Sequence, residues 1–344
     1  MPLAYSTFTI PFPGGGNTGH AVGTNIYMVV GLTGVYILDT TTDTVTGSVS
    51  GFTGNWVSSV LDKTTGRIIM VGPTTAGAST MRVGVIDTST NTYSTAITSI
   101  SYPSSDELPT TLCLTGRTLC CFGRTRATRI DIDTWANTTT TIPTRAPAQS
   151  YRTDAVPVGS NVWVWGRYGH VAAVSEIEEF DPATGTITGH PITVPPGSGG
   201  ATDRAATGCF AVGSTIYGFD SSFGWVGKYD TAAHSYSEFP GVAATAYSRS
   251  TKVGNLVVAL RNQSVNPVDI LDVTNDTFLT TPTFAASATR RYPALIGDRF
   301  YMPRSGLQPG LVYRTDVLSG IPLPAAPDSG WSVGSIRWGF TPSS

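Results

Sequence analysis

Two short stretches decide the fold: ILDTTTDT at residues 37–44 and VIDTSTNT at residues 85–92. In each, an apolar strand ends in Asp, and Asp or Asn follows four residues later. The first Asp can accept backbone N–H bonds, while the later Asp or Asn tolerates the left-handed backbone of a turn. The pattern therefore predicts a tight corner between two antiparallel strands.

The corner recurs along the chain at intervals of 42 to 49 residues. The further copies are Asp133…Asn137, Asp181…Gly185, Asp230, Asp272…Asp276 and, more weakly, Asp316…Gly320. A second signal repeats out of phase with it, as AVGTNIY at residues 21–27 and AVGSTIY at residues 211–217. Similar glycine turns precede apolar strands at Gly66, Gly116, Gly159, Gly254, Gly297 and Gly334. Each unit thus reads as four strands, a to d, with the glycine turn joining a to b and the Asp corner joining c to d.

Units of about 40 to 50 residues with four short strands are typical of a β-propeller, in which each blade packs against its neighbours. The sequence therefore predicts an all-β fold with a single β-propeller domain over residues 1–344. Eight a–b turns and seven c–d corners favour seven full blades and a split eighth, with residues 4–11 and 332–340 closing the ring. The alternative is a seven-bladed ring with the terminal segments packed outside it.

Several strands b end in glycine after apolar residues: VVG at 29–31, MVG at 70–72, CFG at 121–123 and WVWG at 163–166. In this respect the chain resembles kelch-type repeats, a resemblance that itself implies a β-propeller. Kelch propellers of the galactose-oxidase type bind copper through Tyr and His ligands, and no matching constellation is visible. The four histidines are scattered without metal-ligand spacing. We therefore expect no cofactor, no metal and no catalytic residue.

Composition excludes several classes of protein. Only 13% of the residues are charged, the net charge is −2, and 52 threonines and 38 glycines accompany just three lysines. This charge argues against a protein that binds nucleic acid by neutralising phosphates. No apolar run approaches the roughly 18 residues of a membrane-spanning helix, so membrane insertion is not expected. The four cysteines are expected to be buried reduced thiols, with Cys113 and Cys120 facing each other across a hairpin.

Arginines recur near the start of successive strands a. They are Arg152, Arg204, Arg249 and Arg290, the last followed by Arg291. In a propeller these positions surround the mouth of the central channel, on the face shared by the b–c and d–a loops. Guanidinium groups in such a ring suit a carboxylate, sulfate or phosphate ligand. The alternative is that they pair with groups of neighbouring blades.

Two b–c loops are rich in aromatic residues. The first contains Trp165, Arg167, Tyr168 and His170, and the next contains Phe223 and Trp225. Exposed aromatic rings beside polar groups suit sugar rings, and they suit protein contacts equally well. The alternative is that these rings only cap the packing of the blades. Glu176 and Glu178, which share one strand face, are expected to be solvated.

The Thr-, Gly- and Ser-rich, Lys-poor composition is typical of surface components, yet the first ten residues have no basic or continuous apolar signal segment. The overall impression is similar to phage tail-associated or capsid-decorating proteins. We therefore expect a non-enzymatic virion protein, made in the host cytoplasm, that contacts other virion or tail proteins or a host-surface glycan. The alternative is a cytoplasmic location, as a bacterial scaffold protein. The alternative functions are a lectin-like propeller and a carbohydrate-active or oxidase enzyme.

Overall fold

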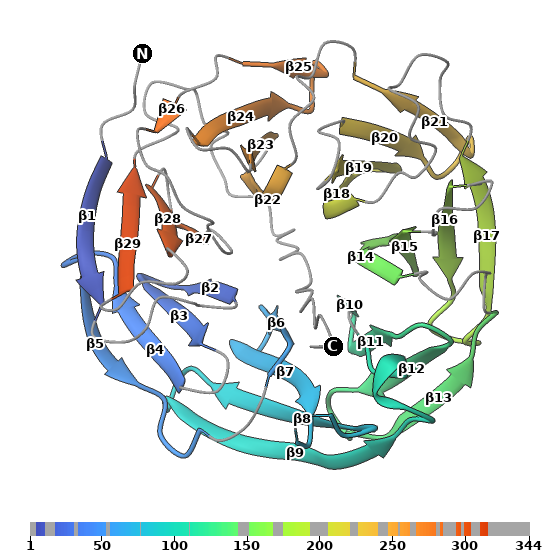
Figure 1. The fold of residues 1–344 in the computed structure, drawn as a ribbon, viewed down its shortest axis with the longest axis horizontal. Helices are drawn as coiled ribbons and strands as arrows, with labels where there is room; N and C mark the ends of the chain where they lie inside the picture. Colours follow the sequence, from blue (N-terminus) through green and yellow to red (C-terminus); the bar gives the residue numbers. More distant parts are fainter. Residues whose placement is uncertain are drawn as a thin grey trace, which may run out of the picture.

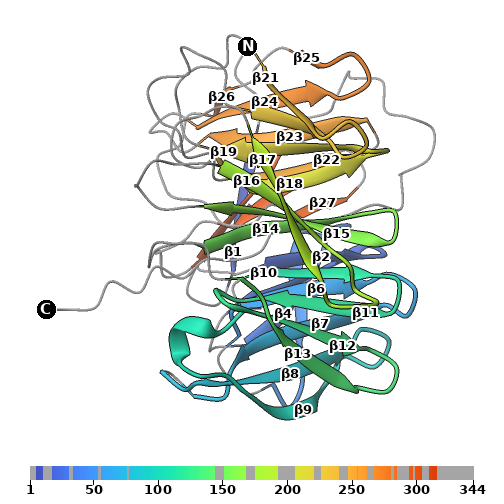
Figure 2. The same cartoon turned by 90° about the vertical axis from the view of Figure 1, so that its right-hand side faces the viewer.

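The computed structural model confirms the β-propeller. Its described strands form a ring of small sheets around a central axis (Figure 1), and Figure 2 shows the same ring turned by 90°. The described residues are 5–10, 18–30, 34–52, 56–75, 77–109, 111–143, 151–167, 175–192, 206–220, 226–239, 247–253, 255–261, 266–279, 283–284, 294–296, 299–303 and 310–315. No helix within these residues is long and apolar enough to cross a membrane.

The described strands form seven antiparallel sheets, six of four strands and one of five. The innermost strands are β2 (Thr18–Val22), β6 (Ser58–Asp62), β10 (Thr111–Thr115), β14 (Tyr151–Val158), β18 (Ala206–Val212), β22 (Tyr247–Val253) and β27 (Ala294–Ile296). The second strands are β3 (Asn25–Val30), β7 (Arg67–Pro73), β11 (Thr118–Phe122), β15 (Asn161–Arg167), β19 (Thr215–Asp220), β23 (Leu256–Arg261) and β28 (Arg299–Pro303).

The third strands are β4 (Gly34–Asp39), β8 (Thr80–Asp87), β12 (Arg126–Asp131), β16 (Ser175–Phe180), β20 (Val226–Asp230), β24 (Asn266–Asp272) and β29 (Gly310–Thr315). The outermost are β5 (Thr44–Ser48), β9 (Thr92–Ser101), β13 (Asn137–Thr141), β17 (Ile187–Ile192), β21 (Ser235–Glu238), β25 (Thr277–Phe278) and β1 (Tyr5–Ile10). We number the sheets as blades in chain order, so that blade 1 is β2–β5 and blade 7 is β27–β29 with β1. The short strand β26 (Thr283–Phe284) adds to blade 6 by pairing with β24, and a 3-10 turn, η1 (Ser105–Glu107), follows β9.

The prediction of seven full blades and a split eighth is wrong. β1, which was expected to help build an eighth blade, pairs antiparallel with β29 and forms the outermost strand of blade 7. The innermost strands of blades 7 and 1, β27 and β2, contact each other directly, so the ring closes there without a further sheet. The number of sheets is that of the alternative, but β1 belongs to a blade instead of packing outside the ring. Residues 332–340 lie outside the described residues.

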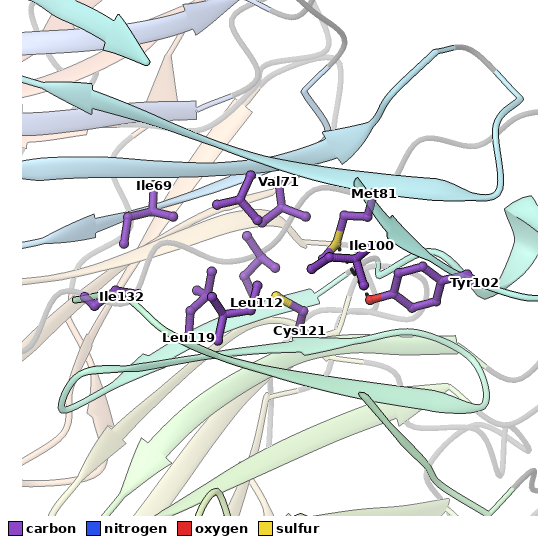
Figure 3. Close-up of a cluster of buried hydrophobic side chains, with 11 residues drawn as sticks. Ile69, Val71, Met81, Ile100, Tyr102, Leu112, Leu119, Cys121 and Ile132 are labelled. Carbon is purple, nitrogen blue, oxygen red and sulfur yellow. Dashed lines mark hydrogen bonds between the residues drawn. The ribbon is translucent and has the colours of Figure 1, made fainter. Parts of the chain in front are cut away.

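The core lies between the blades, because both faces of each sheet are covered. Ile69 and Val71 of blade 2 and Leu119 and Cys121 of blade 3 belong to one buried cluster, which Figure 3 shows as side chains meeting between two sheets. Strands of this kind read as nearly continuous apolar runs, as in β7 with the sequence RIIMVGP. Burial of these side chains on folding provides the main driving force for closing the ring.

The turn chemistry expected from the sequence is present. The a–b turns place Gly23, Gly66, Gly116, Gly159 and Gly213 at φ values between 53° and 71°. Five non-glycine residues with positive φ and Gly185 (φ 80°) occupy the matching position of the c–d corners. The five are Asp43, Asn91, Trp135, His234 and Asp276. The two alternating signals in the sequence therefore mark the same end of the blades, where the a–b turn and the c–d corner lie side by side.

Candidate functional site

Each described c–d corner is built on an aspartate at or just beyond the end of the third strand. Asp39 accepts hydrogen bonds from the backbone N–H and the hydroxyl of Thr41, both at 2.7 Å. Asp87 does the same with Ser89. These bonds, led by the side-chain hydroxyl, lower the pKa of both carboxyls. The aspartates therefore have a structural task within their own turns, and no group of three or more His, Cys, Asp or Glu among the described residues is arranged to hold a metal ion.

One corner differs from its prediction. The sequence suggested Asp133…Asn137, but in blade 3 the capping residue is Asp131, which accepts the N–H groups of Asp133 and Thr134. The left-handed residue is Trp135, with φ 62°. Tryptophan is disfavoured in this conformation, so propensity pointed to Asn137, which instead begins the outer strand.

Three tyrosines in the second strands reach the corner of the next blade, a contact that we call the tyrosine latch. Tyr27 donates to the carbonyl of Thr88 (2.9 Å) and to Oδ1 of Asn91 (2.6 Å). Tyr217 donates in the same way to Val273 and Asp276. In both cases the acceptors are the residue after the corner aspartate and the left-handed residue.

The third latch closes the ring. Tyr301 of blade 7 donates to the carbonyl of Thr40 and to Oδ1 of Asp43 in blade 1, at 3.3 and 3.1 Å. The latch was not predicted from the sequence. Its signal was present as Tyr27 and Tyr217 in the repeated segments at residues 21–27 and 211–217.

Other blade boundaries use different side chains at the same end of the ring. Arg117 bridges blades 2 and 3 by binding Asp62 at 2.7 Å and Asp133 at 2.9 Å. Arg129 of blade 3 donates to two carbonyls of the blade 4 corner, those of Pro182 and Ala183. This end of the described ring is thus occupied by contacts between blades.

The boundary between blades 4 and 5 carries an aromatic stack in place of a tyrosine latch. Trp163 occupies the strand position of Tyr27, and its ring centroid lies 5.1 Å from that of His190. His190 stacks on His234, the left-handed corner residue of blade 5, at 4.2 Å and 11°. Glu179 lies 3.1 Å from Nε2 of His190.

Arg152 was expected near the channel mouth, either as a ligand group or as a contact between blades. Its side chain is 7% exposed and forms two parallel hydrogen bonds with Glu178, both of 2.7 Å. Nη1 also donates to the carbonyls of Gly123 and Arg124 in the preceding blade. The geometry of Arg152 fits the alternative of a contact between blades.

Glu178 was expected to be solvated and is instead completely buried. A sheet that is packed on both faces leaves no solvent-facing side for this position, and Arg152 supplies the compensating charge. Asp154, also buried, accepts the backbone N–H groups of Ala155 and of Cys209 in blade 5. Buried charges on the inner strands therefore join blades 3, 4 and 5.

Trp165 was expected to be an exposed loop residue and instead lies in β15, where it is 1% exposed within the core cluster of blades 4 and 5. Arg167 ends the same strand, and Arg249 lies in β22, but the surroundings of these two side chains fall outside the described part. Residues Tyr168, His170, Arg204, Phe223, Trp225, Arg290 and Arg291 lie outside the described residues altogether. The structure thus does not bring the predicted aromatic and arginine residues together into one described site.

The cysteine prediction is confirmed. All four thiols are buried and unpaired by disulfides, and Cys113 lies opposite Cys120 in the ladder of β10 and β11. Burial raises the pKa of Cys120 to about 12. Thiols held in the neutral form in this way are poor nucleophiles and poor metal ligands.

Comparison with known proteins shows that solved structures share this fold. No family model and no curated protein matches the sequence. A solved structure of a catalytically inactive virginiamycin B lyase from Staphylococcus aureus, with quinupristin, matches with a TM-score of 0.62 and 12% identity, covering 91% of this chain and 99% of that one. BamB from Moraxella catarrhalis matches with a TM-score of 0.57, the same identity and the same coverage. At this identity the likeness shows a shared fold and carries no activity or partner over to this chain.

Proposed function

We propose that this chain is a non-enzymatic β-propeller that makes protein contacts, and that it does so as a tail-associated component of a phage virion. The observation that carries the proposal is the chemistry of the ring's perimeter. Among the outermost strands β1, β5, β9, β13, β17, β21 and β25, Glu238 is the only Asp, Glu, Lys or Arg. Threonine and serine dominate instead, as in β13 with the sequence NTTTT.

An outermost strand presents unpaired backbone N–H and C=O groups along one edge, which suit the addition of a strand from another protein. Natural monomers usually block such edges with charges, prolines or bulges. β5 and β9 are interrupted by register shifts, and β17 contains Pro191. β13 and β1 pair in regular register and have neither charge nor proline, so they are the described edges best suited to such a contact.

The alternatives receive less support from the described residues. The lectin-like function relied on Trp165, whose ring is buried, and its other residues lie outside the described part. Buried ionisable side chains such as Arg152, Glu178 and Asp154 are bonded within or between blades. Protein contact through the perimeter therefore remains the function that the geometry supports best.

The virion location is tested by quantitative mass spectrometry of purified phage particles from the host that produces this chain. We expect the chain at a fixed copy number per particle, resistant to salt washing. Its absence from purified particles, with abundant chain in the lysate, would contradict the virion assignment. If the purified chain binds host cells but not phage particles, host-surface recognition is favoured. Hits on a glycan array would favour the lectin-like alternative.

The perimeter contact is tested by placing a charge on the edge. Thr138 of β13 lies exposed opposite Arg129, so the variant Thr138→Glu gains a cross-strand partner and should fold normally. Thr98→Glu on the interrupted strand β9 is the matched control, because Thr98 is also exposed. We expect Thr138→Glu alone to reduce incorporation into particles at unchanged melting temperature. Equal incorporation of both variants and the parent would refute a role for the β13 edge.

A further inference from the structure

The boundary between blades 1 and 2 contains a buried polar pair that takes no part in the contacts described above. Nε2 of His20, on β2, lies 2.8 Å from the hydroxyl of Ser59, on β6. The two residues are 1% and 3% exposed. Nδ1 of His20 is buried and has no hydrogen-bond partner among the described residues. An unsatisfied buried ring nitrogen costs stability, so its presence in a packed boundary calls for an explanation.

The same positions in the next three boundaries, between blades 2 and 5, are apolar or thiol. His20 lies opposite Tyr27 in the ladder of blade 1, and the equivalent residues of blades 2, 3 and 4 are Val60, Cys113 and Val156. Ser59 corresponds in the same way to Leu112, Ala155 and Cys209 of blades 3, 4 and 5. Between blades 2 and 5 the contact is thus built from apolar or thiol side chains, whereas the boundary between blades 1 and 2 uses an imidazole and a hydroxyl; blade 6 has Thr251 and Ser250 at these positions.

We propose that the His20–Ser59 pair makes the boundary between blades 1 and 2 an acid-sensitive seam, at which protonation of His20 weakens the ring. A charged imidazole in this site has one hydroxyl as partner and no compensating carboxylate among the described residues. By contrast, the buried Arg152 is paired with Glu178. Blade 1 forms one side of this seam, and the Tyr301 latch joins the same blade to blade 7. Opening of the seam therefore loosens the ring next to the point where it closes.

The titratable groups around the pair do not offset the charge. Tyr27, opposite His20 on β3, directs its hydroxyl to the blade 2 corner. Asp62, three residues beyond Ser59 on β6, binds Arg117 and the turn residues Thr64 and Thr65. Burial alone lowers the pKa of His20 from 6.5 to about 4.

The sign of the pH effect follows from this direction. Between pH 6.5 and 4 the unfolded chain binds a proton at His20 that the folded chain does not, so acid favours unfolding in this window. A shift of about 2.5 pKa units corresponds to a roughly 100-fold decrease in the folding equilibrium constant between pH 7 and pH 4. Well below pH 4 and well above pH 6.5 His20 contributes no further dependence.

The experiment compares the full chain with the variant His20→Val/Ser59→Cys, which copies the Val156–Cys209 pair of blades 4 and 5. A second variant, His20→Gln, keeps a side-chain amide for Ser59 but cannot take up the proton. Urea unfolding is measured from pH 7 to pH 4, together with amide hydrogen exchange in β2 and β6. All other groups that titrate between pH 4 and pH 7 are common to the three proteins, so the differences between their pH profiles report His20.

We expect the folding equilibrium constant of the parent to fall about 100-fold more between pH 7 and pH 4 than that of either variant. After correction for the intrinsic pH dependence of amide exchange, the protection factors in β2 and β6 should be lower at pH 5 than at pH 7. Exchange in β14 and β18, at the Val156–Cys209 boundary, serves as the internal control and should change less. Parallel pH profiles for the parent and the variants would overturn the proposal. Should the double variant fail to fold, the profile of His20→Gln decides in the same way.

Discussion

Removal of one partner of the Arg152–Glu178 pair is expected to be among the most damaging single changes in the inner strands. The carboxylate of Glu178 is fully buried and held by two charge-assisted hydrogen bonds. In Arg152→Met this charge stays in the core without its partner, which costs about 3–5 kcal/mol in comparable buried pairs. Glu178→Leu leaves the guanidinium without its carboxylate partner and should cost a similar amount.

The double variant Arg152→Met/Glu178→Leu separates the pair from its surroundings. Replacing both charges by apolar groups is often close to neutral. Here Nη1 of Arg152 also serves the carbonyls of Gly123 and Arg124, so about 1–3 kcal/mol should remain for the acceptors that lose a donor. The double-mutant cycle should therefore give a coupling energy of about 6 kcal/mol, well above the values for exposed pairs.

Urea unfolding followed by tryptophan fluorescence measures all four proteins of the cycle. Additive losses, or single losses below about 1 kcal/mol, would refute the buried pair. Added sulfate or phosphate gives an independent readout, because an anion that stabilises the parent but not Arg152→Met would show a guanidinium available to ligands. We expect no such difference.

Four further outcomes follow from the geometry. Tyr217→Phe should cost about 1.5–3 kcal/mol in urea unfolding, because the latch to Asp276 ends on a carboxylate, and a loss below 0.5 kcal/mol would contradict the latch. Gly84→Ala should destabilise by about 1–3 kcal/mol, since a Cβ there would lie 2.6–2.9 Å from two aromatic rings, and an unchanged melting temperature would disprove this crowding. Cys113 should not react with a thiol reagent until the chain unfolds, so rapid labelling of the native protein would show that it is exposed. Because hydrogen bonds lower the pKa of corner aspartates such as Asp39, stability should fall as pH drops below 3.8, and Asp39→Asn should show less of this loss in thermal unfolding at pH 3.

The architecture was predictable because the turns between its strands are set by local sequence. An aspartate followed four residues later by Asp, Asn or Gly, and a glycine before an apolar strand, each fix a turn through their own backbone preferences. The same reasoning failed at Trp135, where tertiary packing holds a tryptophan in a left-handed conformation that propensity disfavours. It also failed for the blade count, because local signals do not reveal which strand β1 pairs with.

The candidate site was harder to predict because burial in a propeller depends on neighbouring blades. Trp165 and Glu178 look exposed when a strand is read alone, since aromatic and acidic residues near a strand end are common at surfaces. Both are buried because a neighbouring blade covers their face of the sheet, blade 5 for Trp165 and blade 3 for Glu178. The partner of Glu178 lies 26 residues earlier in the chain, a distance at which no sequence pattern connects the two.

The contacts across blade boundaries all depend on a ring that closes through β1 and β29. The direct test is a disulfide between Thr7→Cys and Tyr313→Cys, which lie opposite each other in this antiparallel pair. The matched control is Thr7→Cys with Ile336→Cys, which an eighth blade would bring together. We predict that mild oxidation of the native protein crosslinks residues 7 and 313 in high yield and leaves 7 and 336 unlinked. Efficient crosslinking of 7 to 336, with none between 7 and 313, would contradict the closed ring described here.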